Sequence, residues 1–166
     1  GNLFLVMSMG SGISLFCSQF LSAKISHKKT IMLSIFLSGL CLITIAHVHT
    51  LTLLRIMMFF VGISHGLFLP SATSLIVRMI DQKSWGRAFA IFSIAQSAAF
   101  IFAPFCVDAV MQIASYRSIF YFIGFFSFFL SSTVYLFPER FNLQAKPISF
   151  SFLSYVLSKP TFWVVM

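Results

Sequence analysis

Four polar side chains stand inside long apolar blocks of this 166-residue chain, where they could do chemistry. Asp108 is the only acid deep within a block, and a carboxylate there could couple to protons or to another cation. His65 could relay protons, because imidazole titrates near neutral pH. Arg55 could recognise an anionic substrate through its forked donors. Gln96 lies on the same block as Asp108, so these four residues are the candidates for substrate binding and coupling.

Each ionisable candidate also has a structural interpretation that the sequence leaves open. Asp108 precedes the loop at Ser115 by about two helical turns, so it could be hydrated near the outer mouth. His65 could be neutral and hydrogen-bonded to a neighbouring helix. Arg55 could extend its side chain to the outer membrane interface.

The elements that must position these residues are membrane-spanning helices. The composition is 59% hydrophobic with only 8% charged residues, which a soluble domain of this size could not bury. Crossing a bilayer takes about 20 apolar residues, and helices satisfy the backbone in lipid. We therefore expect an all-α membrane protein with five spans, near residues 2–23, 30–46, 51–79, 87–113 and 118–137.

The basic residues predict the orientation of the spans. Nine of the eleven Lys and Arg residues fall in alternate loops at 24–29, 78–87 and 138–159, which the positive-inside bias places in the cytoplasm. The net charge of +8 therefore faces anionic lipid headgroups, and nucleic acid is not an expected partner. No cysteine pair has metal-ligand spacing, and no catalytic triad or phosphate-binding loop is present. We expect no cofactor and no enzyme activity.

Two segments follow the five spans. Residues 138–159 are polar and predict a cytoplasmic linker, and residues 160–166 look like the start of a further span. The chain opens with Gly1 inside an apolar stretch, without the basic region and cleavage site of a signal peptide. We therefore expect a fragment of a longer protein.

Four stretches, in order, resemble the major facilitator superfamily. Residues 84–92 resemble that family's turn into helix five, and residues 116–120 with Gly124 resemble its entry to helix six. Gly62, Gly66 and Pro70 resemble its glycine-rich helix four, and residues 159–163 resemble its entry to helix seven. By this resemblance, residues 1–137 are the N-terminal bundle from helix two to helix six. Helix one and most of the C-terminal half are absent.

The resemblance implies a secondary active transporter that works by alternating access. This bundle would rock against the missing C-terminal half, with a small-molecule substrate between them near the midplane of the lipid bilayer. The resemblance places the protein in the cell membrane, with proton coupling through Asp108 or His65 as the simplest energy source. The alternative is a non-transporting polytopic protein of the same fold, either receptor-like or an assembly factor.

The same resemblance suggests a cytoplasmic gate and a packing face. Lys24 and Lys28 match basic positions of the family's loop between helices two and three, but Ala23 stands where the family has Asp. Asp81 could supply a substitute, and Arg87 belongs to the same gate. Gly62, Gly66 and Pro70 share one helix face that lets another helix approach closely. On helix five, only Pro104 matches the motif of the proton-coupled drug exporters, which argues against that branch.

Overall fold

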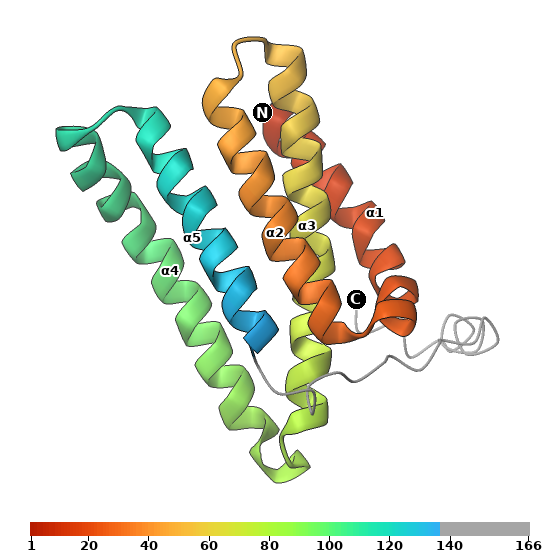
Figure 1. The fold of residues 1–166 in the computed structure, drawn as a ribbon. Coiled ribbons are helices and arrows are strands. Elements are labelled where there is room, and N and C mark those ends of the chain that lie inside the picture. Colours follow the sequence, from red (N-terminus) through yellow and green to blue (C-terminus); the bar gives the residue numbers. More distant parts are fainter. Residues whose placement is uncertain (137–166) are drawn as a thin grey trace.

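The computed structural model describes residues 1–136 except the side chain of Gln19, and it shows five long helices joined by short turns (Figure 1). These are α1 (Asn2–Ile25), α2 (His27–His47), α3 (Leu51–Met79), α4 (Trp85–Ile113) and α5 (Tyr116–Leu136), with a short 3-10 helix, η1 (Gln82–Ser84), before α4. The all-α prediction is confirmed, since the described residues contain no strand. Residue 137, the predicted linker 138–159 and the predicted start of a further span at 160–166 lie outside the described residues.

The helices run up and down, so that alternate turns lie at opposite ends of the bundle (Figure 1). The α1–α2 turn is the tightest, because the chain reverses at Ser26 alone. Ser26 adopts φ 81°, and it is the only non-glycine residue with positive φ in the described part of the chain. Its hydroxyl accepts a hydrogen bond from the backbone N–H of Lys29 at 3.5 Å, which caps the start of α2.

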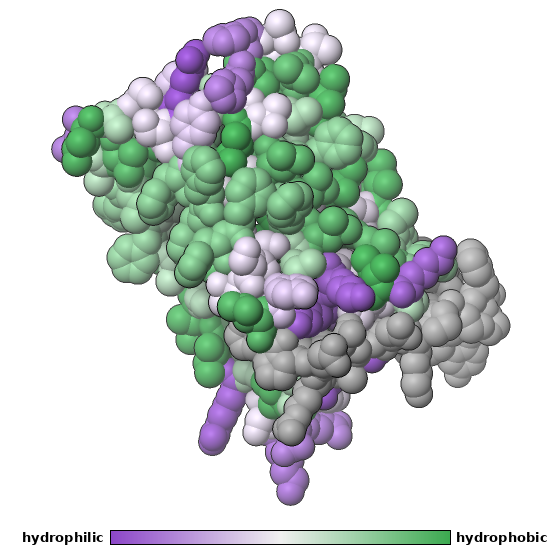
Figure 2. Space-filling view, in the orientation of Figure 1, coloured by the Kyte–Doolittle hydropathy of each residue, from purple (hydrophilic) through white to green (hydrophobic). Residues whose placement is uncertain are grey.

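Four helical segments are long and apolar enough to cross a membrane: His27–His47, Leu51–Met79, Gln82–Ile113 and Tyr116–Leu136. The first predicted span is also a helix, of 24 residues, but its apolar part is the shorter segment Asn2–Ser18. Figure 2 shows a hydrophobic belt across the middle of the visible face, with hydrophilic residues gathered toward the two ends. A belt of this kind matches the lipid core between two polar interfaces. The chain is an integral, multi-pass membrane protein.

The closest packing in the bundle joins α1 to α3. A Cβ atom added at Gly62 would overlap the backbone carbonyl of Met7, and one added at Gly66 would overlap the carbonyl of Ser11. On the opposite side of the contact, a Cβ added at Gly10 would overlap the carbonyl of Phe59. The two backbones are therefore in direct contact, and only glycine leaves room for this approach.

A second pair of glycines joins α2 to α5. A Cβ added at Gly39 would lie 2.9 Å from the carbonyl oxygen of Gly124, and one added at Gly124 would lie 3.1 Å from that of Gly39. The hydroxyl of Ser131 on α5 donates to the backbone oxygen of Met32 on α2 at 3.1 Å. Helix α5 is thus attached to α2, which in turn packs on α3.

Helix α4 lies at the edge of the bundle beside α5 (Figure 1). None of its residues is buried, and Pro104 in its second half is exposed. The other internal proline, Pro70, lies half-buried in α3 and removes a backbone donor from that helix. One turn later, the hydroxyl of Thr73 donates to the carbonyls of Leu69 and Pro70 at 3.0 and 3.1 Å.

The glycine contact predicts that Gly62→Ala destabilises the bundle, because the new methyl group must push α1 away from α3. We expect a loss of about 1–3 kcal/mol in the free energy of unfolding, as for other overpacked interiors. Reversible unfolding in mixed detergent micelles measures this loss. Gly12→Ala is the matched control, since an added Cβ there meets nothing within 4 Å. Equal stability of the two variants would contradict the backbone contact.

Candidate functional site

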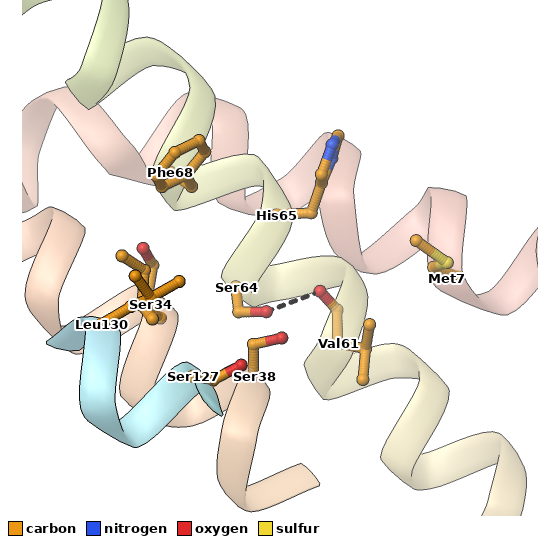
Figure 3. Close-up of a pocket in the computed structure, with 10 residues that line it drawn as sticks. Met7, Ser34, Ser38, Val61, Ser64, His65, Phe68, Ser127 and Leu130 are labelled. Atoms are coloured by element: carbon orange, nitrogen blue, oxygen red, sulfur yellow. Dashed lines mark hydrogen bonds between the residues drawn. The ribbon is translucent and has the colours of Figure 1, made fainter. Parts of the chain in front are cut away.

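A cavity of about 360 Å³ opens between α2, α3 and α5, with one side chain from α1 at its edge. Hydroxyl-bearing and apolar residues alternate around it (Figure 3). The lining residues are Met7, Ser34, Ile35, Ser38, Val61, Ser64, His65, Phe68, Ser127 and Leu130. Such a mixture of apolar walls with a few convergent polar groups is what small-molecule sites in proteins usually have.

The serines of the cavity present oxygen atoms as hydrogen-bond acceptors. Ser34, Ser64 and Ser127 each donate their hydroxyl proton to a carbonyl of their own helix, at 2.7, 2.8 and 2.8 Å. Their lone pairs are still available, since a hydroxyl has two acceptor sites beside its one proton. Figure 3 shows the hydroxyls of Ser38, Ser64 and Ser127 pointing toward one another from three different helices. The polar spot that they form is uncharged.

Among the described residues that line the cavity, His65 is the one ionisable side chain. It is exposed, and in Figure 3 its ring points away from the three converging hydroxyls. His65 therefore lies at the rim of the cavity, where a solute or water can reach it.

The other three coupling candidates lie away from the cavity. Asp108 is exposed on α4, five residues before that helix ends, and its Oδ2 accepts a hydrogen bond from Nε2 of Gln112 at 3.3 Å. Gln96 is exposed near the middle of the same helix. Arg55 is exposed near the start of α3, at the end of the bundle where α2 and α3 are joined. The structure therefore does not bring the four residues into one cluster within the described part of the chain.

The candidates for the cytoplasmic gate share one end of the bundle, and Lys28 has the most defined contacts among them. Its ammonium donates to the backbone oxygen of Tyr135 at 3.0 Å and lies 5.9 Å from the centre of the Tyr135 ring. This contact ties the first turn of α2 to the last turn of α5. Lys24, Asp81 and Arg87 are exposed, and Asp81 precedes η1 without capping it through its side chain.

Several polar groups that shape the bundle were not among the sequence-based candidates. Besides the cavity serines, Ser22, Thr30 and Ser71 are buried where α1, α2 and α3 meet. His27 is also buried, and neither ring nitrogen has a hydrogen-bond partner within residues 1–136. One signal was present in the sequence: Ser11, Ser14, Ser18 and Ser22 recur every three or four residues, which places them on one helix face.

The fold and the open cavity, with its apolar walls and a few hydroxyl groups, define a helical membrane protein with a solute-sized hollow between its helices. The sequence profile of the Major Facilitator Superfamily matches residues 1–166, and the chain belongs to this family. It is therefore part of a membrane transporter, as the resemblance of its turns and glycines implied. A comparison with curated proteins finds no match to the chain.

The hydrogen bond from Lys28 on α2 to Tyr135 on α5 predicts a specific effect of Lys28→Gln. Removing the ammonium leaves the last carbonyls of α5 without this donor, and we expect a loss of about 1 kcal/mol in stability. Thermal unfolding in detergent micelles measures the loss. Lys28→Arg should keep most of the stability, because a cation remains at the helix end. Lys24→Gln is the control on the exposed side of the same turn, and an equal loss in that variant would contradict a special role for Lys28.

Proposed function

We propose that this chain is the N-terminal bundle of a secondary active transporter that moves a small solute by alternating access. The observation that carries this proposal is the family match over the whole chain, on a helical bundle with a hydrophobic belt. In transporters of this design, two helical bundles rock about a site near the midplane of the bilayer. A second bundle from the same gene product would supply the other wall of that site.

In this proposal the solute passes the face of α3 on which His65 lies. The exposed imidazole at the rim of the cavity supports a role in contact with substrate. The serine oxygens behind it add uncharged hydrogen-bond acceptors at the same depth. Arg55 is the corresponding candidate at the outer end, where it would meet an anionic solute on entry or exit.

Protons are the simplest coupling ion. Asp108 is exposed on α4 and has Gln112 as its hydrogen-bond neighbour, so its carboxylate is not covered by the other described helices. Gln96 lies on the same helix, nearer its middle. At the other end of the bundle, Lys24, Lys28, Asp81 and Arg87 would form the cytoplasmic gate. The basic turns then face the cytoplasm of a cell whose plasma membrane holds the protein.

A substrate screen tests the proposal directly. The full gene product is reconstituted in proteoliposomes, a pH gradient is imposed, and a panel of labelled solutes is assayed for accumulation or release. We expect at least one solute to move with the gradient, and that movement to stop when a protonophore collapses it. Absence of gradient-driven movement for every solute would favour the alternative of a receptor-like protein or an assembly factor.

Asp108→Asn should abolish proton coupling if this carboxylate carries the proton. The variant keeps the size of the side chain and one acceptor oxygen, but an amide group replaces the second oxygen and cannot ionise. We expect uphill transport to fall to the background of empty vesicles, while exchange of substrate across the membrane continues. Asp108→Glu is the matched control, since it keeps an ionisable carboxylate at the same position and should retain uphill transport. Normal uphill transport by Asp108→Asn would contradict the assignment.

His65→Ala separates substrate contact from proton relay. Loss of substrate contact should raise KM by about tenfold, the effect of about 1.4 kcal/mol of binding, with kcat little changed. Loss of proton relay should instead flatten the dependence of the transport rate on pH. Transport kinetics measured between pH 5 and pH 8 distinguish these outcomes. A variant with unchanged KM and an unchanged pH profile would exclude His65 from the transport path.

A further inference from the structure

Three hydroxyl groups meet at the inner end of the bundle, one from each of α1, α2 and α3. The Oγ of Ser22 lies 3.3 Å from Oγ1 of Thr30 and 3.1 Å from Oγ of Ser71. All three side chains are buried, with at most 1% of their surface exposed. We call this group the hydroxyl junction. Ser22 lies at its centre, because it contacts both of the other helices.

The protons of the junction can be ordered, because each hydroxyl carries only one. Thr30 donates its proton to the backbone oxygen of Ser26 at 2.9 Å. Ser22 must then be the donor to Thr30, and Ser71 must be the donor to Ser22. The result is a directed chain of hydrogen bonds from α3 through α1 to α2, which ends on the turn between α1 and α2.

The end point of that chain is Ser26, the residue with φ 81°. An L-amino acid other than glycine is strained in this region of backbone space, so neighbouring contacts must hold it there. Two backbone hydrogen bonds hold Ser26, from its N–H to the carbonyl of Ser22 at 3.1 Å and from the N–H of Thr30 to its carbonyl at 3.0 Å. Two further contacts add to them, from the hydroxyl of Thr30 to its carbonyl and from the N–H of Lys29 to its side chain. The turn that they fix carries Lys24 on one side and Lys28 on the other, and Lys28 reaches the end of α5.

Most other buried serines of these helices bond only within their own helix. Ser14 donates to the carbonyl of Ser11, Ser18 to that of Leu15, and Ser34 to that of Ile31. Ser18 and Ser34 are as deeply buried as Ser22, each with 1% exposure. They are therefore matched controls, with the same residue type and burial but no hydrogen bond from their hydroxyls to another helix within residues 1–136.

We propose that the hydroxyl junction is the positioning element of the inner end of this transporter. It holds the α1–α2 turn on α3, so that Lys28 stays in place against α5. The inner ends of α1, α2 and α3 then move as one body through the transport cycle, and no charge is required to keep them together. The claim that these ends move as one body rests on the proposed transport function. The claim that the junction holds the α1–α2 turn on α3 concerns the folded bundle alone.

The first experiment measures the junction in the full gene product by reversible unfolding in mixed micelles. Hydrogen bonds between membrane helices average a free energy that corresponds to a change of about threefold in the unfolding equilibrium. We expect Ser22→Ala and Ser71→Ala each to shift the equilibrium by at least that factor. The double variant should shift the equilibrium by less than the product of the two single factors, because both substitutions break the same hydrogen bond. Thr30→Val, which removes the hydroxyl, should also shift the unfolding equilibrium. Thr30→Ser, which keeps a hydroxyl, should not.

Two results would overturn the junction. One is that Ser71→Ala and Ser22→Ala shift the equilibrium no more than Ser18→Ala and Ser34→Ala. The other is that the effects of Ser22→Ala and Ser71→Ala multiply independently, because residues that share one hydrogen bond must be coupled.

The second experiment tests whether the junction stays closed during transport. Cys17, Cys41 and Cys106 are first replaced by serine, together with any other cysteine of the gene product. Ser22→Cys and Ser71→Cys are then introduced, since the side-chain oxygens of these two residues lie 3.1 Å apart. We expect the oxidised pair to form and transport in proteoliposomes to keep at least half of its reduced rate.

A pair that fails to form, or transport that stops on oxidation and returns with a thiol reductant, would overturn the proposal. If the reduced protein moves no solute at all, the proposed function fails instead. The unfolding measurements then decide the junction by themselves.

Discussion

The rest of the bundle depends on the direct contact between the backbones of α1 and α3. Lipid tails are as apolar as leucine, so apolar side chains gain little by leaving lipid for a helix interface. What holds two helices together is close van der Waals packing, and Gly10, Gly62 and Gly66 allow the closest approach in this structure. This contact places the serine face of α1 against α3 and so decides which hydroxyls are buried.

The other helices are arranged around that pair. Helix α2 packs on α3, and α5 packs on α2 through Gly39 and Gly124, so close backbone approach is used twice. Hydroxyl groups buried between the helices are satisfied without water, either by a carbonyl of their own helix or by a neighbouring hydroxyl. The cavity and the hydroxyl junction both result from these hydroxyl groups between the helices. Helix α4, with no buried residue, is the part of the bundle least constrained by the others.

The helices were predictable because lipid thickness and backbone hydrogen bonding leave few alternatives for long apolar blocks. The block predicted at residues 51–79 agrees with α3 at both ends, and the other helices differ by up to three residues at the ends that the structure describes. The turns were predictable from the basic residues. The polar groups that make contacts between helices were not predictable from the sequence, because their partners depend on how each helix is rotated about its axis. Ser22 meets residues that are 8 and 49 positions away, and Lys28 meets one 107 positions away.

All the substrate and coupling candidates from the sequence except Gln96 were chosen because they are ionisable, and this explains why the sequence analysis missed the serines. A single carboxylate, imidazole or guanidinium stands out in an apolar block, whereas serine is common in every block of this chain. The structure places Asp108, Gln96 and Arg55 on exposed faces and brings only His65 to the cavity. The groups that converge there are neutral hydroxyls, for which spacing along a helix face is the one sequence signal.

The central claim is that α1 and α3 form a fixed pair on which the transporter is built. Spin labels at Phe20 on α1 and Leu53 on α3, both exposed, allow electron paramagnetic resonance to measure the distance between the helices in proteoliposomes. Labels at Phe20 and at Phe102 on α4, also exposed, serve as the reference pair. If α1 and α3 form a fixed pair, the labels give one unchanged distance distribution under opposite pH gradients and with or without substrate. A second distance that grows or shrinks with the gradient would contradict it.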